Sequence, residues 1–453
     1  MNEYVNALYA YDSGWTGKGV TIASVDDGID VNNPEFAGRI SPLSKDFGHT
    51  VTTNADGTQT DSARNSIGDA YSDHGTATSG IIVANRDGKG IQGLAYDAKI
   101  AMLRVTDVDY GTKSEYFMTQ NTAAAVRYAA DNGIKIINRS LNSSAMAPSP
   151  NDVLAQAVTY LASKGGLIIN SAGNQGQSTI SDEFMVNSTN RSSWIFVGAI
   201  DTTGTGYQIS SYSNRPGLSL MDRYVVAPGD NLTLKVGADG GIYASAGTSL
   251  AAPMVTALAA LISQKWPQLS GQQVGDVILT TAKDLGDPGT DPIYGRGLVD
   301  YKAALEPVSP KLSNGQVASS LETNAIVVPA GVGGKEIASA LSDVTVLDAF
   351  GRDFRASMSD RVITPDVRQN VAGLVGSMAN TRSANLVSMN FSGSVSYAFY
   401  GNQRPADMPN AAFNSAMVEG RFGTMSFSYG YRASVGINAP FMGLGPVSDA
   451  FAA

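Results

Sequence analysis

Short apolar runs rich in Ile and Val alternate with helical stretches over the first two hundred residues. The pattern predicts strands and helices in turn, with strands at 19–23, 99–105, 134–141, 166–171 and 194–200 and helices at 122–132 and 152–164. Helices of about a dozen residues between such strands favour right-handed βαβ crossovers. We therefore predict an α/β domain built on a mainly parallel sheet.

Three further elements extend this pattern. A strand with its turn is predicted at 224–229, and residues 249–262 form an apolar run so rich in small side chains that it predicts a buried helix. An amphipathic helix is predicted at 270–282. The pattern indicates one large domain, 1–306.

The texture of the chain changes at Pro307. Residues 307–336 are rich in Ser, Gly, Pro and Val, and we interpret them as a linker. Residues 390–400 and 423–431 alternate apolar and small polar side chains, which predicts strands with one buried face. We expect 337–453 to be a β-rich accessory region, in keeping with two or three domains for a chain of 453 residues.

Composition narrows the classes of function. Lys and Arg total 31 against 40 Asp and Glu, and no dense basic run occurs, so nucleic acid is not an expected partner. The absence of Cys excludes disulfides, thiolate metal sites and cysteine nucleophiles. No uncharged apolar segment of about 18 residues predicts a membrane-spanning helix. The first five residues lack a signal-peptide pattern, so we expect that none exists or that one was removed.

Two candidate catalytic residues lie at the ends of predicted elements, one at the start of a helix and one at the end of a strand. Ser249 opens the buried helix, where unpaired N–H groups and the helix dipole stabilise negative charge. Asp26 ends the first strand, and catalytic groups collect at the ends of parallel strands. Each has an ordinary alternative, a helix cap for Ser249 and a polar turn for Asp26.

The chain has two histidines, so a histidine base is His49 or His74. His49 lies in the polar stretch 49–73, which predicts a long surface loop, whereas His74 begins a helix of small residues. His74 is therefore the better candidate. Asn174 ends another strand with an amide that can donate, although Asn at such places is usually a turn former.

Together these four residues match the requirements of acyl transfer. Ser249 would attack a carbonyl, His74 would take and return its proton, and Asp26 would hold the imidazole. The Asn174 side chain and the Ser249 N–H would bind the oxyanion. Activity should then fall as pH drops through the apparent pKa of His74, about 7.

Three motifs in this order carry a resemblance to a known family. They are Val25-Asp26-Asp27-Gly28, His74-Gly75-Thr76 with Ser79-Gly80, and Gly247-Thr248-Ser249 with Ala251 and Pro253. Over residues 15–306 the chain resembles the subtilisin-like serine proteases, the subtilase family. The resemblance implies a three-layer α/β/α domain and a serine endopeptidase that hydrolyses peptide bonds in proteins.

The resemblance also implies where substrate would bind. Asn174 matches the family's oxyanion amide, while Ser140-Leu141 and Ala172-Gly173 match the two segments that line the first specificity pocket. The chain departs from the family at Asn142, where many members have Gly, and this departure affects the pocket entrance. Asp27 replaces the common Thr or Ser, as in the kexin-like branch, but basic-residue specificity does not follow from this turn alone.

Calcium is a weaker implication of the resemblance. Glu35 and Asp87 fall where many members place ligands of a stabilising calcium ion, which prefers oxygen donors. Arg86 and Lys89 lie in the same loop and favour solvated carboxylates instead. We expect no required cofactor, leave a structural calcium open, and assign no metal ligand.

Residues 346–355 resemble the segment after the protease domain in autotransporter-type subtilases of Gram-negative bacteria. This implies a secreted or cell-surface protein on the bacterial exterior, with an outer-membrane translocating barrel beyond Ala453 as a partner. The alternative for this region is a plain β-rich accessory domain. The alternative function is a catalytically silent, surface-displayed binding or adhesive passenger, but the intact Asp26, His74, Asn174 and Ser249 favour a protease acting on protein or peptide substrates.

Overall fold

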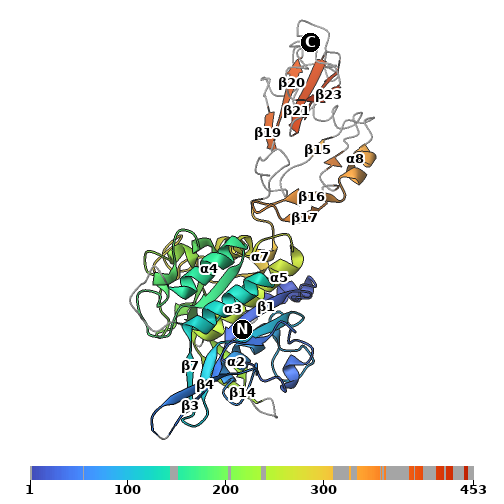
Figure 1. Ribbon diagram of the computed structural model, residues 1–453. Coiled ribbons are helices and arrows are strands. Elements are labelled where there is room, and N and C mark those ends of the chain that lie inside the picture. The colour runs from blue at the N-terminus through green and yellow to red at the C-terminus, as the bar shows by residue number, and fades with distance from the viewer. Residues whose placement is uncertain are drawn as a thin grey trace. The chain divides into compact units, whose positions relative to one another are not determined.

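The chain divides into two compact units, Met1–Glu306 and Pro307–Ala453 (Figure 1). The computed structural model describes most of the first unit and short parts of the second. The described residues are 3–54, 56–142, 152–202, 206–235, 241–309, 326–327, 334–357, 359, 362–363, 387–391, 393–400, 415–422, 425–431 and 443–446.

The first unit is built on a central sheet in the order β11-β10-β9-β8-β1-β5-β2, with β12 also paired to β10. All of its ladders are parallel except the one between β10 and β11. Its strands are β1 Thr21–Asp26, β2 Lys45–Asp46, β5 Lys99–Arg104, β8 Ile136–Arg139, β9 Leu167–Ser171, β10 Trp194–Asp201, β11 Gln208–Ile209 and β12 Tyr224–Pro228. The predicted mainly parallel α/β architecture is confirmed.

Helices cover this sheet. In Figure 1, α3 and α4 lie side by side in front of it, and α5 packs on β8, β9, β10 and β12 with α2 and α6 against it. Residues 250–262 of α5 are all buried, as the run of small apolar side chains predicts. The helices are α1 Ala7–Asp12, α2 Asp73–Val83, α3 Thr119–Asp131, α4 Val153–Ser163, α5 Thr248–Lys265, α6 Gly271–Thr281 and α7 Tyr301–Leu305, with 3-10 turns η1 Pro34–Phe36, η2 Glu183–Met185, η3 Arg191–Ser193 and η4 Met221–Arg223.

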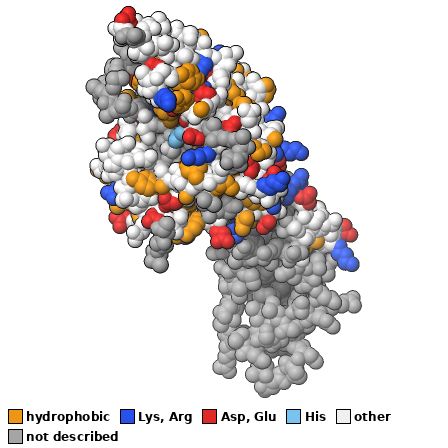
Figure 2. All heavy atoms as spheres, turned by 90° about the horizontal axis from the view of Figure 1, so that it is seen from below, with side chains coloured by type: hydrophobic (Ala, Val, Ile, Leu, Met, Phe, Trp, Pro, Cys, Tyr) orange, Lys and Arg blue, Asp and Glu red, His pale blue; other side chains and the backbone are white. Residues whose placement is uncertain are grey.

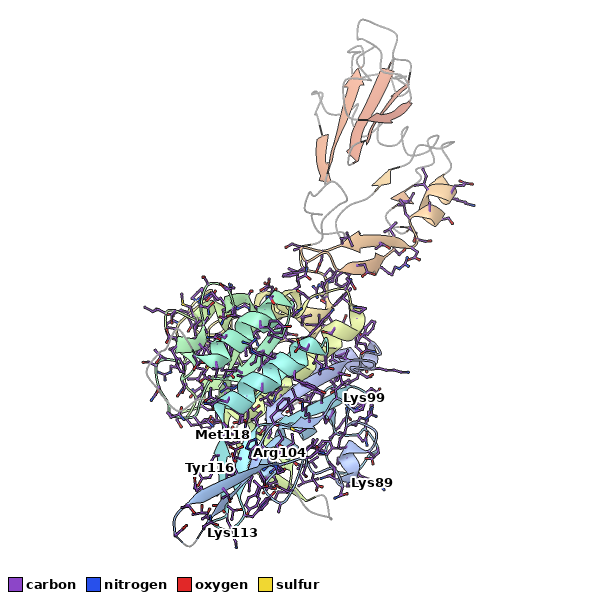
Figure 3. All side chains as sticks on the ribbon, viewed as in Figure 1. Lys89, Lys99, Arg104, Lys113, Tyr116 and Met118 are labelled. Atoms are coloured by element: carbon purple, nitrogen blue, oxygen red, sulfur yellow. The ribbon has the colours of Figure 1, made fainter. Side chains whose placement is uncertain are left out.

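A second, smaller sheet in the order β4-β3-β6-β7 extends from the first unit (Figures 1 and 3). It consists of β3 His49–Thr53, β4 Gln59–Ala63, β6 Thr106–Asp109 and β7 Ser114–Phe117. The prediction of a long surface loop at 49–73 is therefore wrong for the hairpin β3-β4. Every residue of β4 is exposed, so polar side chains occupy both faces and no apolar alternation marks the strand. A further hairpin pairs β13 Asp230–Leu234 with β14 Ile242–Ala246.

The described parts of the second unit are mainly strands. β19 Val387–Phe391, β20 Gly393–Tyr400, β21 Ser415–Phe422, β22 Met425–Tyr431 and β23 Gly443–Pro446 form an antiparallel sheet. The strand predicted at 390–400 is divided between β19 and β20, and β22 lies within the segment predicted at 423–431. The remaining elements are β15 Ile326–Val327, α8 Gly334–Ala340, β16 Val344–Leu347, β17 Asp353–Ala356 and β18 Val362–Ile363. Most of the predicted linker 307–336 lies outside the described residues.

The structure also shows how charged side chains are distributed and whether any described helix could span a membrane. Acidic and basic side chains are interspersed on the face shown in Figure 2, in line with the net charge of −9. Within the described ranges, no helix combines the length and the apolar character needed to cross a membrane.

Candidate active site

The end of β1 and the start of α2 bring Asp26 and His74 into contact. Asp26 is fully buried, and its Oδ1 lies 2.7 Å from His74 Nδ1. An ionised carboxylate only accepts hydrogen bonds, so Nδ1 carries the proton and leaves Nε2 as the acceptor of a neutral ring. Thr78, one turn along α2, donates to Asp26 Oδ2 at 3.0 Å, and the Asp27 N–H donates to Oδ1 at 2.9 Å. The carboxylate is thereby held in one orientation.

Asp27 fixes the first turn of α2. Its carboxylate accepts from the backbone N–H of His74 at 3.0 Å and of Gly75 at 2.7 Å, both of which lack partners within the helix. Position 75 tolerates no larger residue, because a Cβ there would stand 2.1 Å from the Gly28 oxygen. Burial and the adjacent Asp26 charge raise the pKa of Asp27. The carboxylate at position 27 thus positions the backbone of His74.

The surroundings of His74 favour its charged form. Burial lowers the pKa of the imidazole, but the charge and hydrogen bond of Asp26 outweigh burial, and Asp27 and Glu115 add to them. The net effect raises the pKa of His74 to about 9. The side chain remains 36% exposed, so solvent and substrate can reach it.

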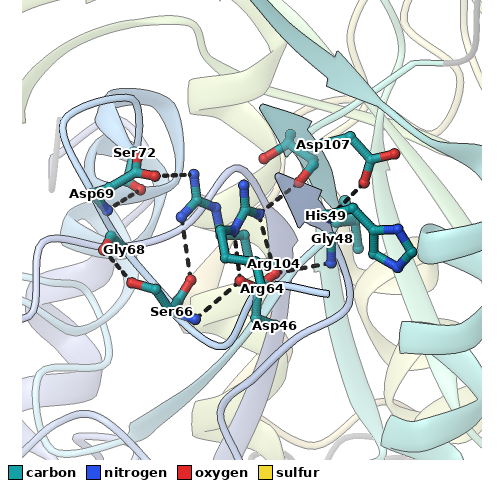
Figure 4. A network of polar contacts seen from close by, with 12 residues as sticks. Asp46, Gly48, His49, Arg64, Ser66, Gly68, Asp69, Ser72, Arg104 and Asp107 are labelled. Atoms are coloured by element: carbon teal, nitrogen blue, oxygen red, sulfur yellow. Dashed lines mark hydrogen bonds and ion pairs between the residues drawn. The ribbon is translucent and has the colours of Figure 1, made fainter. Parts of the chain in front are cut away.

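A polar network supports the loop that leads into α2 (Figure 4). Arg104 ends β5 beside Asp26 in the strand register, and its guanidinium donates to Asp69 Oδ2 at 2.7 Å and to the Ser66 carbonyl at 3.2 Å. The Asp69 N–H donates to Ser72 Oγ at 3.0 Å, and Ser72 Oγ donates to the Asp27 carbonyl at 3.3 Å. The network therefore connects β5 to Ser72, just before α2, and to Asp27, just after β1.

A second pair in Figure 4, Arg64 and Asp46, extends this network towards the smaller sheet. Arg64 Nε and Nη2 lie 2.7 and 3.1 Å from the two oxygens of Asp46, and Nη2 also donates to the Thr106 carbonyl at 2.6 Å. Sequence reasoning missed these residues, because pairs this far apart in the chain leave no local pattern.

Ser249 is the second residue of α5, and its backbone carbonyl has an unusual partner. In a regular helix this carbonyl would accept from residue 253, but Pro253 has no N–H. Ser140 Oγ donates to it instead at 2.9 Å. The helix start is therefore tied to the segment that follows β8.

Asn174 is tied to the same helix start. Its Oδ1 accepts from the Thr248 N–H at 2.9 Å and from Thr248 Oγ1 at 2.8 Å, which turns Nδ2 away from Thr248. A Cβ placed on Gly247 would lie 3.4 Å from Asn174 Nδ2 and 3.7 Å from the Ser249 nitrogen. Both nitrogens therefore lie close to Gly247, beside Ser249.

The two segments expected to bind substrate lie side by side. Asn142 Nδ2 donates to the Ser171 carbonyl at 2.8 Å, and Ser171 Oγ donates back to Asn142 Oδ1 at 3.3 Å. Ala172 is fully buried, and the Gly173 N–H donates to Thr248 Oγ1 at 3.2 Å. Ser140, Leu141 and Asn142 therefore face Ala172 and Gly173 across a pair of hydrogen bonds next to Ser249.

The structure gathers the candidates into two groups. Asp26 and His74 form one group, and Ser140, Gly173, Asn174 and Ser249 form the other. His74 lies at the start of α2, which packs on α5, the helix whose start carries Ser249. In the described part of the chain, no hydrogen bond joins Ser249 Oγ to His74. The other histidine, His49, pairs with Asp61 at 3.0 Å on the hairpin β3-β4 and belongs to neither group.

The loop considered for calcium offers few acidic ligands. Glu35 is 6% exposed, and its Oε2 is buried without a hydrogen-bond partner. Asp87 Oδ1 accepts from the Lys89 N–H, and Arg86 stacks on Tyr11 and Tyr96. Among the residues that the structure describes, no group of three acidic, His or Cys side chains could hold a metal ion.

Comparison with known proteins agrees with this architecture. The Peptidase_S8 profile, described as the subtilase family, matches residues 17–297. Subtilisin BL from Lederbergia lenta is 33% identical over 302 residues, which cover 66% of this chain and 96% of that protein. An extracellular serine protease from Serratia marcescens is 27% identical over 67% of this chain, which spans 33% of that relative's length.

A solved structure leads to the same fold. Sphericase superposes with a TM-score of 0.50 and 28% sequence identity, covering 63% of this chain and 92% of its own. The expected resemblance is confirmed by the profile, the curated relatives and this neighbour. The chain belongs to the subtilase family and is a serine endopeptidase that acts on protein or peptide substrates.

Proposed function

We propose that the peptidase works through an Asp26-His74-Ser249 triad with an oxyanion hole formed by Asn174 and the Ser249 N–H. The observation that carries this proposal is the 2.7 Å contact between Asp26 and His74 at the start of α2, a helix that packs on the one carrying Ser249. Asp26 fixes the tautomer in which Nε2 can take a proton.

The proposed reaction has two halves. Ser249 Oγ attacks the scissile carbonyl and gives its proton to His74 Nε2, and the resulting oxyanion accepts from Asn174 Nδ2 and the Ser249 N–H. The tetrahedral intermediate collapses, the amine leaves with the proton from His74, and the acyl group stays on Ser249. Water then repeats the sequence with His74 as base and releases the acid. No step requires a cofactor.

The positions of Asn174 Nδ2 and the Ser249 nitrogen, both close to Gly247, support the oxyanion hole. Oxyanion donors must point at the place where charge develops. Asn174 is held for this by Thr248, which occupies the amide oxygen and so presents the donor end. We assign Ser140, Leu141, Asn142, Ala172 and Gly173 to the first specificity pocket, because hydrogen bonds join their two segments to each other and to the start of α5, which carries Ser249.

An active-site titration tests the proposal against a silent binding passenger. A fluorophosphonate probe should label the purified wild-type protein stoichiometrically and should not label Ser249→Ala. A passenger that lacks catalysis would remain unlabelled. In that case the triad would be rejected, even though the fold stands.

For calcium, the proposal is limited to stability. The unpartnered Glu35 Oε2 supports a cation near this carboxylate, whose pKa is raised by burial and by Asp87. Thermal unfolding of wild type and Glu35→Gln in calcium and in EDTA tests it. Calcium should raise the melting temperature of wild type alone, and an equal response of both proteins would exclude Glu35 as a ligand.

We propose that the protein acts outside the cell. Its Serratia relative is named as extracellular, and the match covers 33% of that protein's length. Residues 346–355 support an autotransporter arrangement on a Gram-negative cell surface, with a translocating barrel beyond Ala453. Protease protection in intact cells expressing the native gene would separate surface display from release.

A further inference from the structure

The two segments assigned to the specificity pocket leave the central sheet next to each other. The parallel ladder between β8 and β9 ends at Arg139 and Asn170, and one pocket segment follows on each strand. Ligands of α/β sheets bind in the crevice beyond the carboxyl ends of parallel strands. The acyl-side residue of a peptide bound at Ser249 should therefore enter between these two segments.

The side chain of Asn142 spans the space between the two segments. Its Nδ2 donates to the Ser171 carbonyl at 2.8 Å, and Ser171 Oγ donates to its Oδ1 at 3.3 Å. Ser171 is fully buried, whereas Asn142 is partly exposed. The Asn142 amide is therefore both a link between the segments, the Asn142–Ser171 bridge, and a group that a substrate can touch.

Both segments are also tied to the start of the helix that carries Ser249. Ser140 Oγ donates to the Ser249 carbonyl at 2.9 Å. The Gly173 N–H donates to Thr248 Oγ1 at 3.2 Å. Each residue of the bridge is two positions from one of these anchors in the sequence. The bridge therefore crosses near the nucleophile, on the side where the acyl-side residue is proposed to bind.

The second segment has little freedom to move away from the bridge. A Cβ on Gly173 would stand 2.4 Å from Asn214 Nδ2 and 2.8 Å from Gln175 Oε1, so these side chains pack directly on its backbone. Asn214 is fully buried, and its Nδ2 donates to Gln175 Oε1 at 3.0 Å and to the Ala172 carbonyl at 3.1 Å. A bulky substrate side chain must therefore displace the Asn142 amide instead of widening the gap.

Displacing this amide breaks both hydrogen bonds of the bridge. Ser171 Oγ, which is fully buried, would lose the acceptor that Asn142 provides, and the loss of a partner by a buried hydroxyl is unfavourable. The side chains of glycine, alanine and serine need no such displacement, because they end at or just beyond Cβ. The geometry thus favours small residues over large ones.

We propose that the Asn142–Ser171 bridge limits the size of the residue on the acyl side of the scissile bond, so that the enzyme cleaves after glycine, alanine and serine in preference to leucine and phenylalanine. The inference rests on the proposed assignment of the two segments to the specificity pocket. It assigns Asn142 to specificity and gives it no part in proton transfer.

Peptides that differ only in the acyl-side residue, with Ala, Ser, Leu or Phe there, test the proposal. Wild type should show a kcat/KM for Ala at least about tenfold higher than for Phe, a typical size for discrimination by a pocket contact. Asn142→Ala removes the bridge and should raise the ratio of Phe over Ala by about tenfold or more. Asn142→Asp has the same size but cannot donate to the Ser171 carbonyl, so its ratio should lie between the other two.

Asn132→Ala is the matched control. Asn132 Nδ2 also donates to a backbone carbonyl at 2.8 Å, that of Tyr128, but at the end of α3, so its substitution should leave the ratio as in wild type. Circular dichroism and fluorophosphonate labelling verify the fold and the fraction of active enzyme.

Two results would overturn the inference. One is a labelled wild type that cleaves after Phe as well as after Ala, which decides the question even if Asn142→Ala fails to fold. The other is an unchanged ratio in a folded, labelled Asn142→Ala. An unlabelled wild type would overturn the proposed triad instead.

Discussion

The proton affinity of His74 reflects three carboxylates that face it from different elements. Asp26 on β1 is hydrogen-bonded to the ring, while Asp27 in the turn and Glu115 on β7 act on it through their charges. In the smaller sheet, Glu115 pairs in register with Val108 (the neighbouring Lys113 and Tyr116 are labelled in Figure 3). The sequence motif predicts a histidine base with an apparent pKa of about 7, whereas these carboxylates raise the pKa of His74 above that value.

The first prediction concerns pH. A protonated His74 cannot accept the Ser249 proton, so kcat/KM should rise as pH passes the pKa of His74, near 9 instead of 6.5. Stability should run the opposite way. Because folding raises this pKa, the stabilisation by the ion pair is fully present below pH 6.5 and is lost as pH rises through about 9.

Rate profiles and thermal melts across pH measure both trends. His49→Gln is the matched control, because His49 lies on the separate hairpin, and its profile should match wild type. A rate profile that is flat from neutral pH upwards would contradict the raised pKa of His74, and one that is flat from about pH 5 to 9 would contradict the assignment of His74 as base.

Ser249→Ala should lower kcat by about a millionfold while preserving the fold, since the members of a triad act as a unit. The side chain lies at a helix start and makes no hydrogen bond within the described structure, so its loss should leave the melting temperature nearly unchanged. Peptide hydrolysis and circular dichroism on the same sample measure this. Retained activity in a purified variant would refute the nucleophile.

Two variants of Asp27 distinguish the effect of its charge on the pKa of His74 from its hydrogen bonds to the backbone of α2. Asp27→Asn keeps an oxygen for only one of the two N–H groups, because Oδ2 accepts from His74 and Oδ1 from Gly75. It also removes a charge that raises the pKa of His74, so the rate profile should shift to lower pH. Asp27→Ala also loses the helix cap and should cost about 1 kcal/mol more in unfolding free energy. Identical rate profiles for wild type and Asp27→Asn would show that this charge has no effect on His74.

The start of α2 depends on distant strands as well as on its own residues. Arg104 anchors the 66–72 loop through Asp69 and Ser66. Arg104→Met should lower the free energy of unfolding by about 3 kcal/mol, because it leaves the largely buried Asp69 without its ion-pair partner. It should also reduce kcat, since the loop leads directly to His74.

Arg104→Lys serves as the control for charge without the planar fork. It should lie between wild type and Arg104→Met in both urea denaturation and kcat. If Arg104→Met lost stability but retained the full kcat, the network would support the fold and not the position of His74.

The first unit should fold and act without the second. Its core closes through α7, where Tyr301 is fully buried and donates to the Met254 carbonyl at 2.6 Å. Lys265 Nζ also bonds the Leu305 carbonyl at 2.9 Å. A chain of residues 1–306 should therefore unfold cooperatively and hydrolyse peptides at a rate close to that of the full chain.

Truncation after residue 297 provides the contrast. It removes Leu298, Val299 and Tyr301, each of which is buried and contributes about 1.5–3 kcal/mol through apolar burial. That chain should be unfolded or strongly destabilised by circular dichroism. If the 1–306 chain were inactive while folded, the second unit would contribute to catalysis, contrary to this prediction.

Local patterns in the sequence determined the architecture and the chemistry. Strand and helix periods gave the mainly parallel sheet and the buried helix, because the burial of apolar faces imposes those periods directly. The three motifs indicated a serine endopeptidase, and the family match confirms it. The roles of Asp26, His74, Asn174 and Ser249 stay predictions, supported by the contacts around them.

Only the tertiary structure decided the contacts between segments that are distant in the chain. The cap of α2 by Asp27, the support of His74 by Arg104, and the pairing of Arg139 with Asp182 each join residues from different elements. Such pairs leave no period and no local motif, because their energy comes from burial and orientation that exist only after folding. The raised pKa of His74 and the burial of the Arg139–Asp182 ion pair therefore depend on the tertiary structure, although the sequence supplies the residues involved.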